Sequence, residues 1–130
     1  MPEPVDDPAS TDPARLLTVS VERTGDAAIV VAAGEIDLAT IPQLETAIST
    51  VFTNPPPLLV LDFADVRFCA SNGLSLLVET HQEAGPGTTV RVVIDNPSVL
   101  RAITVTGLEQ TLDIRSTRDD ALRAPGTAPS

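Results

Sequence analysis

The chain of 130 residues is poor in the side chains from which catalytic and metal sites are built. It has one histidine and one cysteine, and it has neither tryptophan nor tyrosine. A zinc site needs several His or Cys ligands, so the composition predicts no metal site. With Cys69 as the one cysteine, no disulfide can form within the chain.

The histidine is also badly placed for catalysis. His81 lies ten residues after Ser71, which on a helix is a separation of about 15 Å. That distance is too long for its imidazole to act as a base for the serine hydroxyl. The phosphate-binding patterns GxxxxGK[ST] and GxGxxG are absent as well. We therefore expect a protein that is not an enzyme and that uses no cofactor.

Positive charge is scarce too. Eight Lys and Arg residues stand against 18 Asp and Glu residues, which gives a formal net charge of -10. Nucleic acids and anionic membranes attract basic surfaces, so neither is an expected partner. No apolar run approaches the roughly 18 residues of a membrane span, and the first residues do not resemble a signal peptide. These observations predict a cytoplasmic protein.

What the chain does have is enough apolar sequence for one domain. Hydrophobic residues make up 42% of it, close to the usual globular share. Residues 1–14 are acidic and proline-rich with hardly any large apolar side chain, which predicts a disordered tail. Residues 124–130 have a similar composition and predict a flexible tail. The expected folded domain is therefore residues 15–123.

Hydrophobic periodicity within that domain predicts an α/β fold with a mixed sheet of four to five strands packed against three to four helices. Strands are expected at residues 16–22, 28–33, 58–63, 89–94 and 112–115. Helices are expected from Thr40, with Gln43 completing a capping box, at residues 71–84, from Asn96 to about Gly107, and as a short turn at 119–123. Asp62 is expected near the end of its strand.

The most informative segment runs from Val66 to Leu77, where an apolar strand ends and Ser71 opens a helix. Two interpretations fit this serine. Its hydroxyl can cap the first backbone N–H groups of the helix. Alternatively, Ser71 is a phosphorylation site, because a phosphate there would meet the positive end of the helix dipole. The local sequence alone leaves both open.

The residues around Ser71 have alternatives of their own. Gly73 is costly in a first helical turn and suggests close approach of a partner's backbone. Leu74 fits either a core contact or a docking surface, and His81 and Val78 are expected on the buried face with Leu77. Cys69 is either a buried residue at the end of a strand or a redox-sensitive thiol with a lowered pKa.

Three local motifs accompany this order of strands and helices. These are GEID at Gly34 to Asp37, LDFADVRF ending at Phe68, and Ser-x-Gly-Leu from Ser71 to Leu74. Together they resemble the STAS domain of bacterial anti-sigma factor antagonists, over nearly the whole expected domain. The resemblance predicts a single STAS-like domain.

The resemblance also implies a function. Members of this family bind an anti-sigma factor that is also a serine kinase, and a sigma factor is then released. Phosphorylation of a serine at the position of Ser71 breaks the complex, and a phosphatase can restore it. The implied partner-binding residues are Glu35, Asp37, Asn72, Gly73 and Leu74. The implied state is a monomer or weak dimer.

The sequence departs from the family on both sides of Ser71. The family commonly has aspartate before this serine and serine or threonine after it, whereas this chain has Ala70 and Asn72. Losing the aspartate removes a charge that would repel a phosphate, or a contact that a kinase uses. Two alternative functions stay open. The first is a STAS scaffold or accessory subunit, in a signalling assembly or a lipid transporter, that works without phosphorylation. The second is a domain that binds a small ligand such as a nucleotide.

The acidic turn has two interpretations as well. A phosphate on Ser71 would add about -1.5 to -2 charge beside Glu35 and Asp37, and repulsion would expel an acidic partner. Alternatively, the two carboxylates belong to an ordinary polar turn in which Asp37 serves the start of the next helix.

Overall fold

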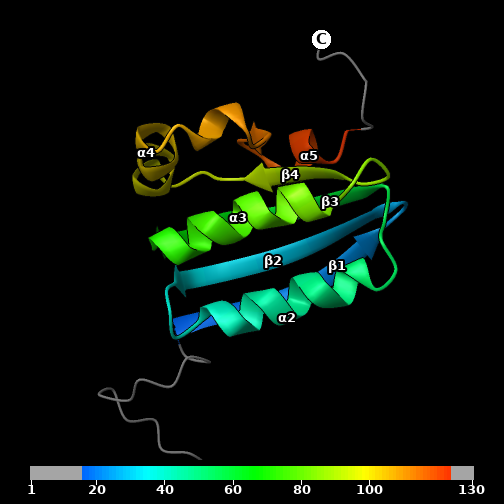
Figure 1. Ribbon diagram of the computed structural model, residues 1–130, viewed down its shortest axis with the longest axis horizontal. Helices are drawn as coiled ribbons and strands as arrows, with labels where there is room; N and C mark the ends of the chain where they lie inside the picture. Colours follow the sequence, from blue (N-terminus) through cyan, green and yellow to red (C-terminus); the bar gives the residue numbers. More distant parts are fainter. Residues whose placement is uncertain (1–15, 124–130) are drawn as a thin grey trace, which may run out of the picture.

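A five-stranded mixed sheet organises the described part of the chain, residues 16–123 of a computed structural model (Figure 1). The sheet order is β1-β2-β3-β4-β5. The first pair is antiparallel and the other three pairs are parallel. The strands are β1 (Leu17–Thr24), β2 (Ala27–Ile36), β3 (Leu58–Cys69), β4 (Thr89–Val93) and β5 (Ile114–Arg115). The tails predicted at residues 1–14 and 124–130 lie outside the described residues.

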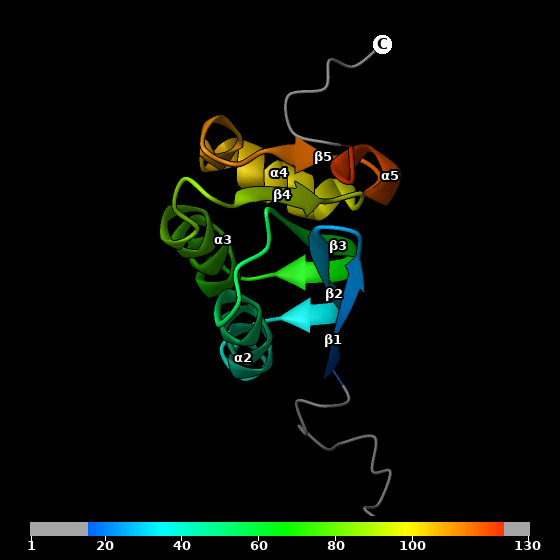
Figure 2. The same cartoon turned by 90° about the vertical axis from the view of Figure 1, so that its right-hand side faces the viewer.

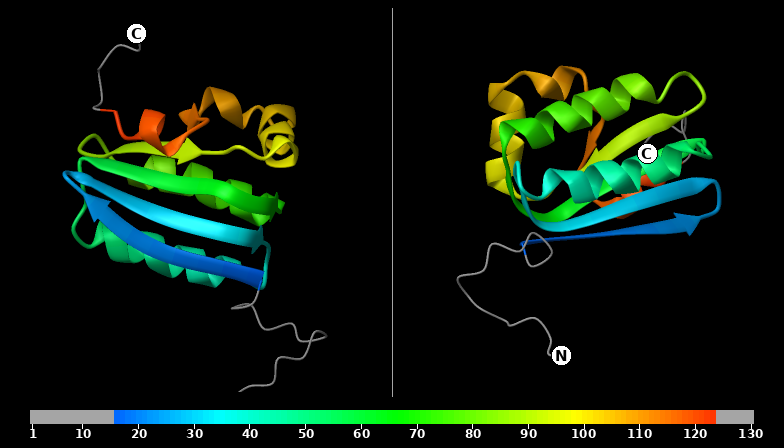
Figure 3. Two further views of the ribbon diagram at one scale, coloured as in Figure 1. Left: turned by 180° about the vertical axis from the view of Figure 1, so that it is seen from behind. Right: turned by 60° about the horizontal axis from the view of Figure 1, so that its bottom comes forward.

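The helices cover the two faces of this sheet unequally. Figure 2 shows α2 and α3 on one face and the short α5 on the other. From behind, β1 and β2 lie in front, with α2 and α3 beyond the sheet (Figure 3). The helices are α2 (Ile41–Phe52), α3 (Ser71–Glu83), α4 (Pro97–Val105), the 3₁₀ turn η1 (Leu108–Gln110) and α5 (Arg118–Ala121). The predicted α/β fold with a mixed sheet is confirmed.

The core follows from the alternation of side chains along the strands. One set of alternate side chains from β2 and β3, including Val30, Leu61 and Phe63, packs under α2 and α3 and is fully buried. The other set, including Ile29 and Val60, forms a smaller cluster beneath α5. Both faces of the central strands are therefore apolar, as expected of parallel strands covered on two sides.

Two strands extend further than the hydrophobic pattern predicted. β2 continues through Gly34 to Ile36, so the predicted GEID turn is mostly strand. β3 continues to Cys69, which places Asp62 in the middle of the strand rather than near its end. The two extensions pair with each other across two register irregularities. Pairing between distant segments lengthened both strands, and local periodicity does not report such pairing.

The start of α2 differs from the prediction in its chemistry. Thr40 holds the N-cap position, but its side chain makes no capping hydrogen bond to the helix. Its buried hydroxyl instead donates to the Glu35 carbonyl at 2.9 Å and accepts from the Asp37 N–H at 2.9 Å. The predicted capping box with Gln43 is therefore wrong, because Thr40 holds the loop before the helix.

The buried face of α3 also contains different residues from those predicted. Leu74 and Leu77 are buried as predicted, but His81 is exposed and Val78 is half-buried. Thr80 occupies the buried position instead, because its hydroxyl donates to the Leu76 carbonyl at 2.8 Å. An internal hydrogen bond makes burial of this polar side chain tolerable.

The ends of α4 agree with the sequence. The Asn96 side chain accepts hydrogen bonds from the N–H groups of Ser98 at 2.8 Å and Val99 at 3.4 Å. Gly107 follows the helix with a φ of 76°, the left-handed conformation that favours glycine. Within residues 16–123, no helix is both long enough and apolar enough to cross a membrane.

Candidate functional site

Ser71 is the first residue of α3, at the end of the molecule where β2 and β3 terminate. Ala70, not Ser71, holds the N-cap position, with an extended backbone at φ -73° and ψ 171°. The Ala70 N–H donates to the Ile36 carbonyl at 2.9 Å, and this bond ties the turn to the end of β2. The interpretation of Ser71 as a helix cap is therefore wrong, because the cap position precedes it.

The Ser71 side chain is exposed, and its hydroxyl makes no hydrogen bond within the described residues. The helix that it opens has 13 residues, so its first N–H groups carry the positive end of a substantial dipole. The hydroxyl is thus accessible, is not held by a structural bond, and lies where a negative charge is favoured.

The first turn of α3 sits directly on the core through Gly73. A Cβ atom added to this glycine would lie 2.6 Å from Cys69 Sγ and 2.7 Å from Ile36 Cγ2, closer than side chains tolerate. The space that Gly73 leaves is therefore filled by the protein's own β2 and β3. This corrects the interpretation that Gly73 admits the backbone of a partner.

Cys69 lies beneath the same turn. The thiol is buried, and burial raises its pKa from 9.0 to about 11. Its Sγ donates to the Ala70 carbonyl at 3.7 Å. Because reactivity requires the thiolate, a raised pKa opposes it. The interpretation of Cys69 as a redox-sensitive thiol with a lowered pKa is wrong.

The two predicted carboxylates have different surroundings. Asp37 Oδ1 accepts from the N–H groups of Ala39 at 2.9 Å and Thr40 at 3.1 Å. Its backbone carbonyl accepts from Ile41 at 2.9 Å, so Asp37 organises the loop before α2. Glu35, by contrast, is a half-buried residue of β2 whose carboxylate has no ion pair within residues 16–123. Asp37 thus fits its structural interpretation, and Glu35 retains a charge available to a partner.

The core interpretation of Leu74 is confirmed, and its role in docking stays a prediction. It is a core residue, only 6% exposed. Its outer edge also lines a hollow of about 360 Å³ that begins at Ser71 and lies between α3 and the segment after α4. The hollow is lined by Ser71, Leu74, Ser75, Val78, Glu79, Thr106 and Leu108.

Asn72 is the second residue of α3 and is half-buried. Its side-chain Nδ2 is buried and has no hydrogen-bond partner within the described residues. An unpaired buried amide donor is destabilising, by roughly 1–3 kcal/mol. No structural role in the described residues explains an asparagine at this position.

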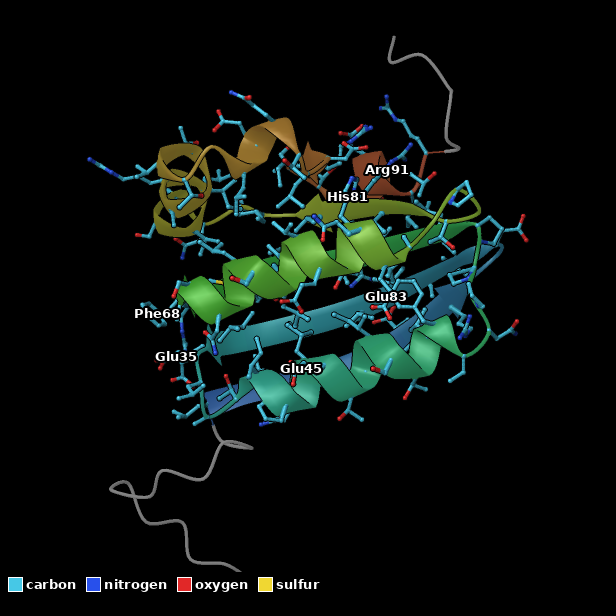
Figure 4. The ribbon with its side chains drawn as sticks, in the orientation of Figure 1. Glu35, Glu45, Phe68, His81, Glu83 and Arg91 are labelled. Atoms are coloured by element: carbon cyan, nitrogen blue, oxygen red, sulfur yellow. The ribbon has the colours of Figure 1, made fainter. Side chains whose placement is uncertain are left out.

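The exposed apolar side chains at this end of the molecule were not predicted from the sequence. Phe68 is 52% exposed and Leu38 is 81% exposed. Phe68 is paired with Glu35 across β2 and β3, and both point outward at the same end of the molecule (Figure 4). The available signal was a large apolar residue, Leu38, in the loop between an acidic turn and a helix.

Comparison with known proteins places this geometry in a family. The model of the STAS domain matches residues 18–121, and the chain belongs to the STAS domain family. It is 37% identical over 106 residues to the anti-sigma-F factor antagonist RsfB of Mycobacterium tuberculosis. That alignment covers 82% of this chain and 87% of RsfB.

Solved structures agree with the family. A crystal structure of an anti-sigma factor antagonist from Mycobacterium paratuberculosis is 38% identical with a TM-score of 0.79, and the match covers 91% of this chain and 96% of that one. The unphosphorylated form of the anti-sigma factor antagonist SpoIIAA is 19% identical with a TM-score of 0.69, over 86% of this chain and 100% of that one. At this identity, the SpoIIAA structure supports the fold alone.

Proposed function

We propose that this STAS domain is an anti-sigma factor antagonist, controlled by phosphorylation of Ser71. It binds an anti-sigma factor that is also a serine kinase, and the sigma factor held by that protein is released. The likeness to RsfB and to the antagonist from Mycobacterium paratuberculosis supports the class. The observation that carries the site is the exposed Ser71 hydroxyl, without a hydrogen bond in the described residues, at the start of α3.

The chemistry asks little of this chain. Ser71 Oγ attacks the γ-phosphorus of ATP bound by the kinase, and the bond from that phosphorus to the β,γ-bridging oxygen breaks. ADP leaves, and the hydroxyl proton passes to a base of the kinase. This chain contributes an accessible nucleophile at the start of α3, and the kinase supplies every catalytic group. We place this exchange in the cytoplasm and expect a phosphatase to reverse it.

The phosphate would change the surface around Ser71. It adds about -1.5 to -2 charge at neutral pH. The dipole of α3 favours that charge by roughly 0.3–1 kcal/mol, while the carboxylate of Glu35 repels it. The phosphorylated serine is therefore compatible with the fold but unfavourable to a partner that fits the neutral surface.

The experiment mixes the full chain with each candidate anti-sigma kinase of the same genome and with ATP. Intact mass spectrometry then compares the wild type with Ser71→Ala, and Ser75→Ala serves as a matched control because Ser75 is exposed one turn later on α3. We expect one phosphate on the wild type and the control, none on Ser71→Ala, and loss of the complex on phosphorylation. A phosphate that persists in Ser71→Ala would overturn the assignment of this residue.

A second candidate function has one observation in its favour. The neighbours of Ser71 are Ala70 and Asn72, both departures from the family pattern. A STAS domain that binds its partner permanently, as a scaffold or accessory subunit, would show a stable complex and no gain in mass with ATP. The same measurement therefore separates the two functions.

A further inference from the structure

Large apolar side chains are exposed mainly at one end of the domain. Within residues 16–123, four large hydrophobic residues are exposed, and three of them belong to the loop after β2, the end of β3 and α4, which lie at the same end of the domain as Ser71 (Figure 1). They are Leu38 at 81%, Val105 at 77% and Phe68 at 52%, whereas Val21 at 40% lies in the middle of β1. Single exposed apolar residues need no explanation, but a cluster of them marks a contact surface.

The backbone holds these residues around Ser71. Phe68 precedes Ser71 by three positions, and Leu38 follows Ile36, whose carbonyl accepts the hydrogen bond of Ala70. On the other side of Ser71, the hollow between α3 and the segment after α4 is lined by Thr106, the neighbour of Val105. In Figure 1 the start of α3, the end of β2 and α4 lie at the same end of the molecule.

We infer that Leu38, Phe68 and Val105, together with the hollow beside Leu74, form one docking surface, here called the apolar band. Its occupant is an anti-sigma factor that presents an apolar hollow with a cationic side chain at its border. This inference rests on the proposed function and adds which residues supply the binding energy. Ser71 lies in the middle of the band, so the band is continuous with the proposed phosphorylation site.

The charges at the border of the band indicate the sign of the partner. Glu35 on one side and Glu79 in the hollow have no ion pair within residues 16–123, and Arg67 beside Phe68 is likewise unpaired there. Asp37 beside Leu38 and Arg101 one turn before Val105 add to this border, so three carboxylates stand against two guanidinium groups, and the whole chain carries -10. A cationic group opposite Glu35 complements this border and speeds association at low salt.

The band also explains how one phosphate breaks the complex. A phosphate on Ser71 is strongly hydrated, and docking would have to strip this water while apolar side chains on both sides require a dry contact. The added charge is unfavourable to the apolar hollow of the partner, whatever the partner's net charge. Expulsion thus follows from polarity and does not require repulsion between the phosphate and a charge of the partner.

The test measures the Kd of the anti-sigma factor that binds the wild-type chain. Leu38→Ser and Phe68→Thr are each expected to weaken binding about tenfold or more, as for exposed apolar anchors at the centre of an interface. Val21→Thr is the control, because Val21 is an exposed apolar residue outside the band, and its Kd should stay within about twofold. Glu35→Gln should lower the dependence of Kd on salt concentration.

The possible outcomes distinguish failure of the docking surface from failure of the proposed function. If the wild type binds no anti-sigma factor, the proposed function fails and the band loses its occupant. If the wild type binds but Leu38→Ser and Phe68→Thr bind equally well with unchanged melting temperatures, only the inference fails. If sedimentation shows that these variants dissociate a dimer of this chain and leave the Kd unchanged, the band is a self-association surface and the inference is wrong.

Discussion

Charged side chains form ion pairs at the α5 face of this domain, whereas those at the end that carries Ser71 have none within residues 16–123. Arg118, the first residue of α5, lies 2.8 Å from the buried Asp62 of β3 and 3.0 Å from Glu22 of β1. The hydrogen bond that Arg118 Nε donates to Asp62 Oδ2 is the main cause that raises the pKa of Arg118. Around Ser71, the carboxylate of Glu35 and the guanidinium of Arg67 have no such partners within residues 16–123.

The α5 face needs its ion pairs. A helix of four residues is too short to be stable alone, so it must be held by its surroundings. Arg91 donates to the carbonyls of Ala121 and Arg123, and its Nε lies 3.4 Å from Asp113 Oδ2, near enough for an ion pair but not aligned for a hydrogen bond. Paired charges beside an apolar cluster hold the fold together.

The Ser71 end has the reverse arrangement. Its interior is tightly packed through Gly73 and Cys69, while its surface keeps exposed apolar side chains and charges that have no ion pair within residues 16–123. Paired charges thus stabilise the α5 face, whereas the Ser71 end is the surface proposed for recognition. The four predictions below test this separation, beginning with the largest expected effect.

The buried thiol beneath the Ser71 turn should make stability fall in alkali. Cys69 ionises near pH 9 when unfolded and near 11 when folded. Its contribution is therefore fully present below pH 9 and is lost as the pH rises toward 11, a change of about 2–3 kcal/mol. Urea unfolding from pH 7.5 to 11 should show this loss in the wild type and a shallower loss in Cys69→Ala.

Cys69→Ala is itself the control, because it shares all other titrating groups with the wild type. The quantity compared is the slope of the free energy of unfolding against pH. Equal slopes for the wild type and Cys69→Ala would mean that the thiol is not protected by the turn above it.

Breaking the ion pair beneath α5 should change stability and leave binding intact. Arg118→Met leaves Asp62 buried without its partner, at a cost of about 1–3 kcal/mol, below that of a fully buried pair because Arg118 is 36% exposed. Urea unfolding measures this cost. The Kd for the anti-sigma factor should not change.

Arg101→Met is the matched control, because Arg101 is exposed on α4 and has no ion pair within residues 16–123. A loss of stability as large in the control would show that the effect comes from net charge and not from the Asp62 pair.

Adding one methyl group under the Ser71 turn should destabilise the fold. Gly73→Ala places a Cβ against Cys69 and Ile36, and relief of this overlap costs about 1–3 kcal/mol. The better helix propensity of alanine returns up to about 1 kcal/mol, which leaves a net loss of about 1–2 kcal/mol in urea unfolding.

Gly87→Ala is the control, because a Cβ at Gly87 would meet nothing within 4 Å. Equal stability of Gly73→Ala and the wild type would contradict the close packing between α3 and the sheet.

The smallest effect is expected at Ser71 itself. Because its hydroxyl makes no capping bond, Ser71→Ala should change the free energy of unfolding by no more than about 0.5 kcal/mol. Asn96→Ala removes a real cap from α4 and should cost about 1 kcal/mol. Thermal unfolding of both variants makes the comparison, and a larger loss for Ser71→Ala would restore the cap interpretation.

Local signals in the sequence were sufficient for most of the elements. The alternation of apolar residues located β1 and β4, and the Asn96-Pro97 and Gly107 signals located both ends of α4. These signals act between residues that are close in sequence, so a pattern can report them. Ser71 was found in the same way, from the switch between strand and helix periodicity.

The nature of the site required contacts across the chain. Local sequence left Ser71 open as a cap or as a phosphorylation site, but in the fold Ala70 holds the cap position and its N–H donates to the Ile36 carbonyl. Gly73 looked available to a partner until Cys69 and Ile36 were found to fill the space beside it. Neither contact can be inferred from spacing, because both depend on β2 meeting the end of β3.

The α/β order of elements, the single domain and the place of Ser71 at a strand-to-helix turn could be predicted from patterns in the sequence. The pairing of charges and the exposure of apolar side chains depend instead on tertiary packing. Arg118 and Asp62 are separated by 56 residues, and Leu38 and Phe68 come from different elements. Pairing and exposure are properties of surfaces that distant segments form together, so the packed chain alone defines them.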